Sequence, residues 1–100
     1  MPKKRDEYRL SPAALRDLEG IWLYTLEQWG LGQAQHYTDE ITAAFDKLVN
    51  NPQQGMSCEN MRKGYRRGLV RRHVIYFRVT EYGIAIIRVL HALMDARQQL

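Results

Sequence analysis

The residue types that most often carry enzyme chemistry are scarce in this chain and widely separated. His91 is the strongest candidate, because Arg88 lies three residues before it and Asp95 four residues after it. An imidazole that a carboxylate orients is a typical general base. The preferred interpretation is structural, with His91 hydrogen-bonded to Asp95 at the end of an aliphatic segment.

The other candidate groups indicate no catalytic site. His36 lies in a helical pattern, where an isolated histidine is typically a surface or packing residue, and His73 follows the basic pair Arg71–Arg72. Cys58 is the only cysteine, which excludes an internal disulfide and a four-thiolate metal site and favours a reducing compartment. No phosphate-binding glycine loop or nucleophile motif occurs. We therefore predict no catalytic residue, no metal and no cofactor.

Positive charge is concentrated in the second half of the chain. The 15 Lys and Arg residues against 11 Asp and Glu residues give a net charge of +4. Residues 55–100 contribute +6, whereas residues 8–54 contribute −3. This distribution indicates an anionic partner, either a nucleic acid or an acidic protein. Because the cations are interleaved with Tyr65, Leu69 and Val70, we expect a folded binding surface, and a merely solvated sheet face is the alternative.

The length of the chain limits its architecture. One hundred residues have room for one hydrophobic core, so we expect a single domain over residues 1–100. A hydrophobic content of 45% is typical of a folded chain. The basic residues 3–5 precede Asp6 and Glu7 rather than an apolar segment, and no apolar run approaches the roughly 18 residues of a membrane span. We therefore expect a cytoplasmic protein.

The first half of the sequence predicts a short strand and a helical hairpin. Residues 5–10 are extended, and Ser11 and Pro12 then supply a helix N-cap and a first-turn proline. Gly30 ends this helix, and a second amphipathic helix runs from about Gln33 to Asn50. So short a connection makes the two helices antiparallel. The predicted buried stripe of the first helix is Leu15, Leu18, Trp22, Leu26 and Trp29.

The second half predicts a small antiparallel sheet. Residues 53–63 show no period and predict a loop, whereas residues 65–70, 74–79 and 84–90 are rich in β-branched and aromatic side chains. The last of these segments is nearly all aliphatic, which predicts a central strand covered on both faces except at Arg88. A short helical turn follows from Asp95. The predicted fold class is α+β in the order β-α-α-β-β-β, with the hairpin packed on the sheet.

Four segments of this sequence resemble the ParE toxins of the RelE/ParE superfamily. They are YRLSPAA at residues 8–14, GYR at 64–66, RHVIYFRV at 72–79 and IIRVLHALMD at 86–95. The last segment is the most specific, because an aliphatic strand reading Arg-Val-Leu-His with an Asp four places after the His is close to a signature of the ParE branch. The resemblance covers about residues 8–95, which is nearly the whole chain.

The resemblance implies the toxin of a type II toxin–antitoxin system, which inhibits DNA gyrase and is neutralised by a ParD-like antitoxin. RelE-like relatives instead cleave mRNA on the ribosome, which requires several cations and a Tyr or His near the C-terminus as acid or base. Residues 92–100 contain no tyrosine, and Leu93, Met94 and Asp95 stand near the expected phosphate site. These departures favour gyrase inhibition without catalysis. A RelE-like ribonuclease and a basic nucleic-acid-binding module remain alternatives.

Two groups of binding residues are expected on this basis. The segment after the last strand departs most from the ribonuclease pattern and is expected to be least needed for packing, so it is the expected gyrase contact. The antitoxin-binding candidates are Arg66, Arg71, Arg72 and Arg78, and the gyrase-contacting candidates are Arg88, His91 and Arg97. We expect no membrane partner and no direct contact with nucleic acid.

Overall fold

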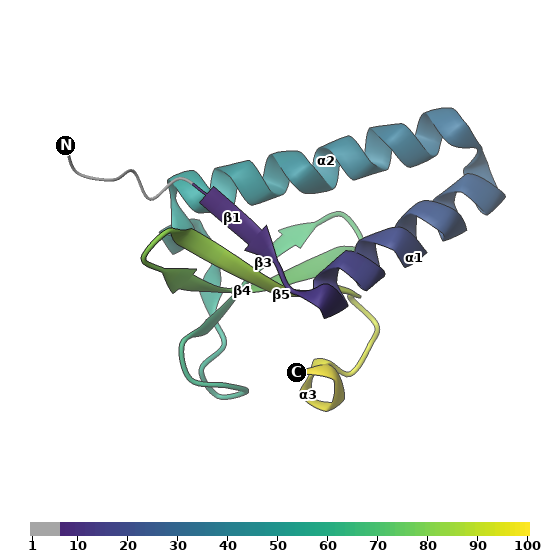
Figure 1. Ribbon diagram of the computed structural model, residues 1–100. Helices are drawn as coiled ribbons and strands as arrows, with labels where there is room; N and C mark the ends of the chain where they lie inside the picture. The colour runs from purple at the N-terminus through teal and green to yellow at the C-terminus, as the bar shows by residue number, and fades with distance from the viewer. Residues whose placement is uncertain (1–6) are drawn as a thin grey trace.

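Two long helices cover one face of a five-stranded sheet, and a short C-terminal helix lies on the opposite face (Figure 1). The computed structural model describes residues 7–100, so the first two residues of the predicted extended segment 5–10 lie outside it. No helix in the described part of the chain is both long and apolar enough to cross a membrane.

The order of the elements confirms the predicted α+β class. The elements are β1 (Glu7–Leu10), α1 (Pro12–Trp29), α2 (Leu31–Asn50), the 3-10 turn η1 (Pro52–Gln54), β2 (Met56–Ser57), β3 (Tyr65–Val70), β4 (His73–Thr80), β5 (Gly83–His91) and α3 (Ala96–Gln99). The prediction of an unstructured loop over residues 53–63 missed β2. That strand has only two residues, which is too short to produce an alternating pattern.

The strands follow the order β1-β5-β4-β3-β2, so the first strand lies beside the last. β1 is parallel to β5, and all the other pairs are antiparallel. β1 covers only the first half of β5, because its last pair joins Leu10 to Ile86. β5 therefore has an open edge from Ile87 onward, and the start of α1 lies against that edge.

The ends of α1 confirm the predicted capping residues. The Ser11 hydroxyl accepts a hydrogen bond from the Ala14 amide (3.0 Å) and donates one to the carbonyl oxygen of Ile87 (2.7 Å). This one side chain both caps α1 and fixes it to β5. At the other end, Gly30 has a φ of +92° and is the only residue between α1 and α2. The antiparallel hairpin follows from that single-residue turn.

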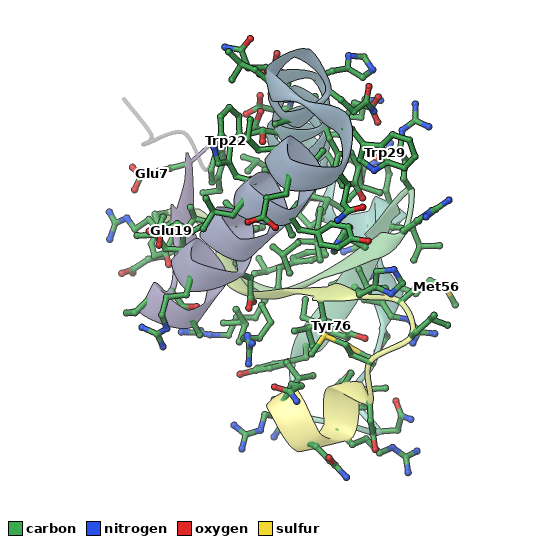
Figure 2. The ribbon with its side chains drawn as sticks, turned by 90° about the vertical axis from the view of Figure 1, so that its right-hand side faces the viewer. Glu7, Glu19, Trp22, Trp29, Met56 and Tyr76 are labelled. Carbon is green, nitrogen blue, oxygen red and sulfur yellow. The ribbon has the colours of Figure 1, made fainter. Side chains whose placement is uncertain are left out.

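The buried face of α1 differs from the predicted stripe. Ala14 and Thr25 are buried, whereas Leu15 is 49% exposed and Trp29 is 72% exposed at the end of the helix (Figure 2). Residues 14, 18, 21 and 25 have the same three-and-four spacing, and all of them except Leu18 lie one position before a residue of the predicted stripe. Small Ala14 belongs to the cluster beneath the hairpin, and the buried Thr25 hydroxyl donates to the carbonyl oxygen of Ile21 within the helix. The predictions of buried Leu15 and Trp29 were therefore wrong.

Hydrophobic clusters lie on both faces of the sheet. The cluster beneath the hairpin includes Ile41, Phe45, Ile75, Phe77 and Ile86. The cluster on the opposite face includes Cys58, Val74, Tyr76, Leu90 and Ala96. Figure 2 shows Tyr76 between the sheet and α3. The prediction that the last strand is covered on both faces is thus confirmed. Within the second cluster, burial raises the pKa of the Cys58 thiol.

Candidate functional site

A large hollow lies between the helical hairpin and one end of the sheet. This docking groove has a volume of about 1010 Å³ and is bounded by α1, the start of α2, the turn between β3 and β4, and the end of β5. Its exposed apolar side chains are Tyr24 and Trp29 of α1 and Met94 after β5. Exposed aromatic residues around a concave surface are typical of a protein-binding site.

The charged groups of the groove are mainly cationic. Arg16 and Arg72 line it, and within residues 7–100 neither of them takes part in an ion pair. Arg71 also lines it, but its guanidinium forms a two-point pair with Glu40 of α2 and lowers the pKa of that carboxyl. The groove thus combines apolar and basic groups, which suits an acidic amphipathic segment.

Two histidines meet where β4 begins and β5 ends. The rings of His73 and His91 are edge-to-face with centroids 5.4 Å apart, and the Tyr37 hydroxyl lies 2.6 Å from Nδ1 of His73. Burial lowers the pKa of His73, and the neighbouring His91 lowers it further, whereas Asp17 acts in the opposite direction. The His73 ring packs against Tyr37 of α2 and His91 of β5, and its lowered pKa favours the uncharged form.

The predicted hydrogen bond between His91 and Asp95 does not form. Nδ1 of His91 accepts from the Leu93 amide (3.1 Å), and the Asp95 carboxylate accepts from the Arg97 amide (3.1 Å) as the N-cap of α3. Asp95 faces α3 rather than His91, because the first-turn amides of a helix need an acceptor. His91 consequently lacks the orienting carboxylate that a general base at this position would use.

Arg88 is held by a partly buried ion pair that the sequence analysis missed. Its Nε and Nη2 each donate to the Asp17 carboxylate at 2.8 Å, and the same carboxylate accepts from the Val89 amide at 2.9 Å. In the pair, 19% of the Arg88 side chain and 13% of the Asp17 side chain are exposed, and Asp17 raises the pKa of Arg88. Arg88 Nη1 also donates to the carbonyl oxygen of Gln99 (3.1 Å), so this residue joins α1, β5 and α3.

The structure separates the four arginines predicted to bind the antitoxin. Arg71 and Arg72 lie at the groove, whereas the Arg66 guanidinium donates to the carbonyl oxygens of Pro52 (3.1 Å) and Gly55. Arg78 is exposed on β4 and alternates with buried Phe77, which places it on the sheet face opposite the hairpin.

The C-terminal segment is more tightly packed than the sequence predicted. Arg97 is exposed on α3, but Ala96 is only 7% exposed and belongs to the second hydrophobic cluster. Arg88 further fixes the last turn through Gln99. The expectation that residues 91–100 are the least needed for packing fits the exposed residues 92–95 but not α3, because Ala96 helps to cover the outer face of the sheet.

The lowered pKa of His73 makes the stability of the protein depend on pH. Because its pKa is lowered from 6.5 by folding, the unfolded chain binds this proton at a higher pH than the folded chain does. The contribution of uncharged His73 to the free energy of unfolding is complete above pH 6.5. It decreases as the pH falls from 6.5 towards the lowered pKa of the folded state. We expect urea unfolding to show lower stability at about pH 5.5 than at about pH 7.5, with His73→Gln reducing the difference.

His36 provides the matched control for that experiment, because its ring is exposed on α2 and contacts Glu40 at the protein surface. Comparison of His73→Gln with His36→Gln separates the effect of the half-buried ring from that of a histidine at the surface. An unchanged slope in the His73→Gln variant would show that other groups cause the dependence.

Comparisons with known proteins agree with the arrangement of the elements. The family model for the ParE toxin of the type II toxin–antitoxin system parDE matches residues 8–96. Toxin ParE1 of Mycobacterium tuberculosis is 43% identical over 94 residues, which cover 93% of this chain and 96% of that protein. Toxin ParE1 of Caulobacter vibrioides is 43% identical over 93 residues, with the same two coverages.

The fold also matches a solved structure described as the chromosomal ParDE TA system from P. aeruginosa. The TM-score is 0.75 at 20% identity, and the match covers 89% of this chain and 98% of that chain. This likeness shows a shared fold. Together with the family match over nearly the full length, it leads to one assignment: the chain belongs to the ParE toxin family of type II toxin–antitoxin systems.

Proposed function

We propose that this ParE-family toxin acts in the cytoplasm by binding and inhibiting DNA gyrase without catalysis, and that a ParD-like antitoxin neutralises it. The observation that carries the proposal is the family match over residues 8–96. The lack of an orienting carboxylate at His91 supports binding over catalysis, because Asp95 is used as a helix cap.

The docking groove is the proposed antitoxin site. An acidic amphipathic segment would place carboxylates near Arg71 and Arg72 and apolar side chains on Tyr24 and Trp29. Arg66 and Arg78 lie on other parts of the sheet. The antitoxin would contact them only if it extended beyond the groove over the surface of the toxin.

Charge reversal at the groove tests the antitoxin site. We expect Arg71→Glu with Arg72→Glu to slow association with the antitoxin by about tenfold at low salt and to reduce its salt dependence, because long-range attraction is lost. Stopped-flow association at several salt concentrations measures both effects. The matched control reverses Arg62 and Lys63, two exposed cations in the loop before β3 that do not line the groove. Equal association rates for the two double variants would exclude this surface.

The activity itself is tested with purified toxin and gyrase. We expect the toxin to inhibit DNA supercoiling and to leave mRNA intact in a translation extract, with induced DNA damage and growth arrest in cells. Cleavage of ribosome-bound mRNA with unaffected supercoiling would establish the RelE-like ribonuclease instead. A neighbouring reading frame that encodes a ribbon-helix-helix protein with an acidic tail would support the toxin–antitoxin pairing.

The proposed gyrase contact is the surface around α3, with Arg97 and His91 as contacting residues and Arg88 as the residue that positions α3. We expect Arg97→Ala to weaken gyrase inhibition while antitoxin binding is kept, because its exposed guanidinium makes no ion pair within residues 7–100. A point substitution is the appropriate test, since deletion of residues 96–100 would also remove buried Ala96. Full inhibition by Arg97→Ala would shift the contact to the helical hairpin.

A further inference from the structure

Gly20 lies in the middle of α1, where the fold gives it no function. Glycine lowers the stability of a helix interior relative to alanine. A Cβ atom on Gly20 would meet nothing within 4 Å, and its φ is not in the positive range. By contrast, a Cβ on Gly68 would lie 3.0 Å from a Leu48 methyl group, and Gly30 and Gly64 have positive φ values. The packing of this chain therefore does not explain the glycine at position 20.

The position of Gly20 on α1 suggests an intermolecular role. Gly20 lines the docking groove, and so do Arg16 one turn before it and Tyr24 one turn after it. Residues four apart on a helix are surface neighbours, so these three form one row. The row presents a cation, a notch without a side chain and an exposed aromatic ring.

We infer that an acidic amphipathic helix of the antitoxin packs directly against the backbone of α1 at Gly20. A side chain at this position would hold the partner helix further from α1. The distance between packed helices depends on the side chains at their contact, and glycine permits the closest approach. Carboxylates of such a helix meet Arg16 and Arg72, and its apolar face meets Tyr24 and Trp29. This inference rests on the antitoxin partner of the proposed function.

Substitutions of increasing size at Gly20 test the inference. Gly20→Ala is expected to raise Tm by about 4 °C, because it removes a glycine from a helix interior. Gly20→Leu is expected to fold as well as the wild type and to weaken binding of the antitoxin encoded beside this toxin by at least about tenfold. Isothermal titration calorimetry measures the affinity, and thermal unfolding measures the stability.

Gly32 is the matched control, because it is also a helical glycine with open space around it but does not line the groove. Gly32→Leu should bind the antitoxin as the wild type does. Antitoxin affinity unchanged in Gly20→Leu would overturn the inference while leaving the proposed function intact. Absence of antitoxin binding by the wild type would overturn the proposed function itself. If Gly20→Leu kept its antitoxin affinity but no longer inhibited gyrase, Gly20 would belong to the gyrase contact, and the inference would also be overturned.

Discussion

Replacement of Arg88 by alanine is expected to lower the free energy of unfolding by about 2–3 kcal/mol, because the carboxylate of a partly buried ion pair keeps its charge and loses both hydrogen bonds to the guanidinium. Asp17 would keep only the Val89 amide as a hydrogen-bond donor after losing both contacts at 2.8 Å. The open edge of β5 and the last turn of α3 would lose their common anchor. Urea unfolding at neutral pH measures the change.

An exposed ion pair of the same chain provides the control. Arg9 pairs with Glu7 at the surface, with 59% and 48% of the two side chains exposed. Solvent screens such exposed pairs, so Arg9→Ala should have a much smaller effect than Arg88→Ala. The double variant Asp17→Ala with Arg88→Ala should be less destabilised than the sum of the single variants, because the two residues interact directly. Equal costs for Arg88→Ala and Arg9→Ala would contradict the structural role assigned to the pair.

The same pair decides how a loss of gyrase inhibition at Arg88 should be interpreted. Its guanidinium is bound to Asp17 and to the carbonyl oxygen of Gln99, so Arg88→Ala is expected to loosen α3. Faster amide hydrogen exchange in α3 together with weaker inhibition would mark Arg88 as a positioning residue. Weaker inhibition with α3 unchanged would mark it as a direct contact.

The element order was predictable because it depends on local patterns. Ser11, Pro12 and Gly30 mark helix ends by their own conformational preferences, and the β-branched segments follow the strand period. The parallel pairing of β1 with β5 was not predictable, since it joins residues more than seventy positions apart and no local pattern encodes it. The buried row of α1 differs from the predicted stripe because small Ala14 and polar Thr25 are buried, and neither contributes to the apolar spacing from which the stripe was predicted.

The candidate site was predictable only in part for the same reason. The basic character of the second half pointed to Arg71 and Arg72, which line the groove, but charge alone does not show that Arg66 binds nearby carbonyl groups or that Arg88 is paired. One signal was available for the pair. Arg88 is the single charged residue in an aliphatic strand, which indicates that it has an acidic partner, but α1 carries several charged residues and the sequence does not single out Asp17.

Gly83→Ala is expected to destabilise the protein by about 3 kcal/mol or more, because the first residue of β5 has both a special backbone conformation and no space for a side chain. Its φ is +140°, and a Cβ would lie 1.9 Å from the Glu7 carbonyl oxygen. Urea unfolding measures the global effect, and amide hydrogen exchange of β1 measures the local one.

The backbone around Gly83 has no room to relax without a loss of structure. Glu7 is its partner in the β1–β5 register, and the Glu7 amide donates to the carbonyl oxygen of Tyr82 at 3.0 Å. Displacement of β1 would also move Tyr8, whose ring packs against Phe45 of the main cluster with centroids 5.1 Å apart. Gly32→Ala, in open space on α2, should leave stability nearly unchanged. Similar stability of the two alanine variants would mean that β1 contributes little to the fold, because its pairing with β5 cannot survive a side chain at this position.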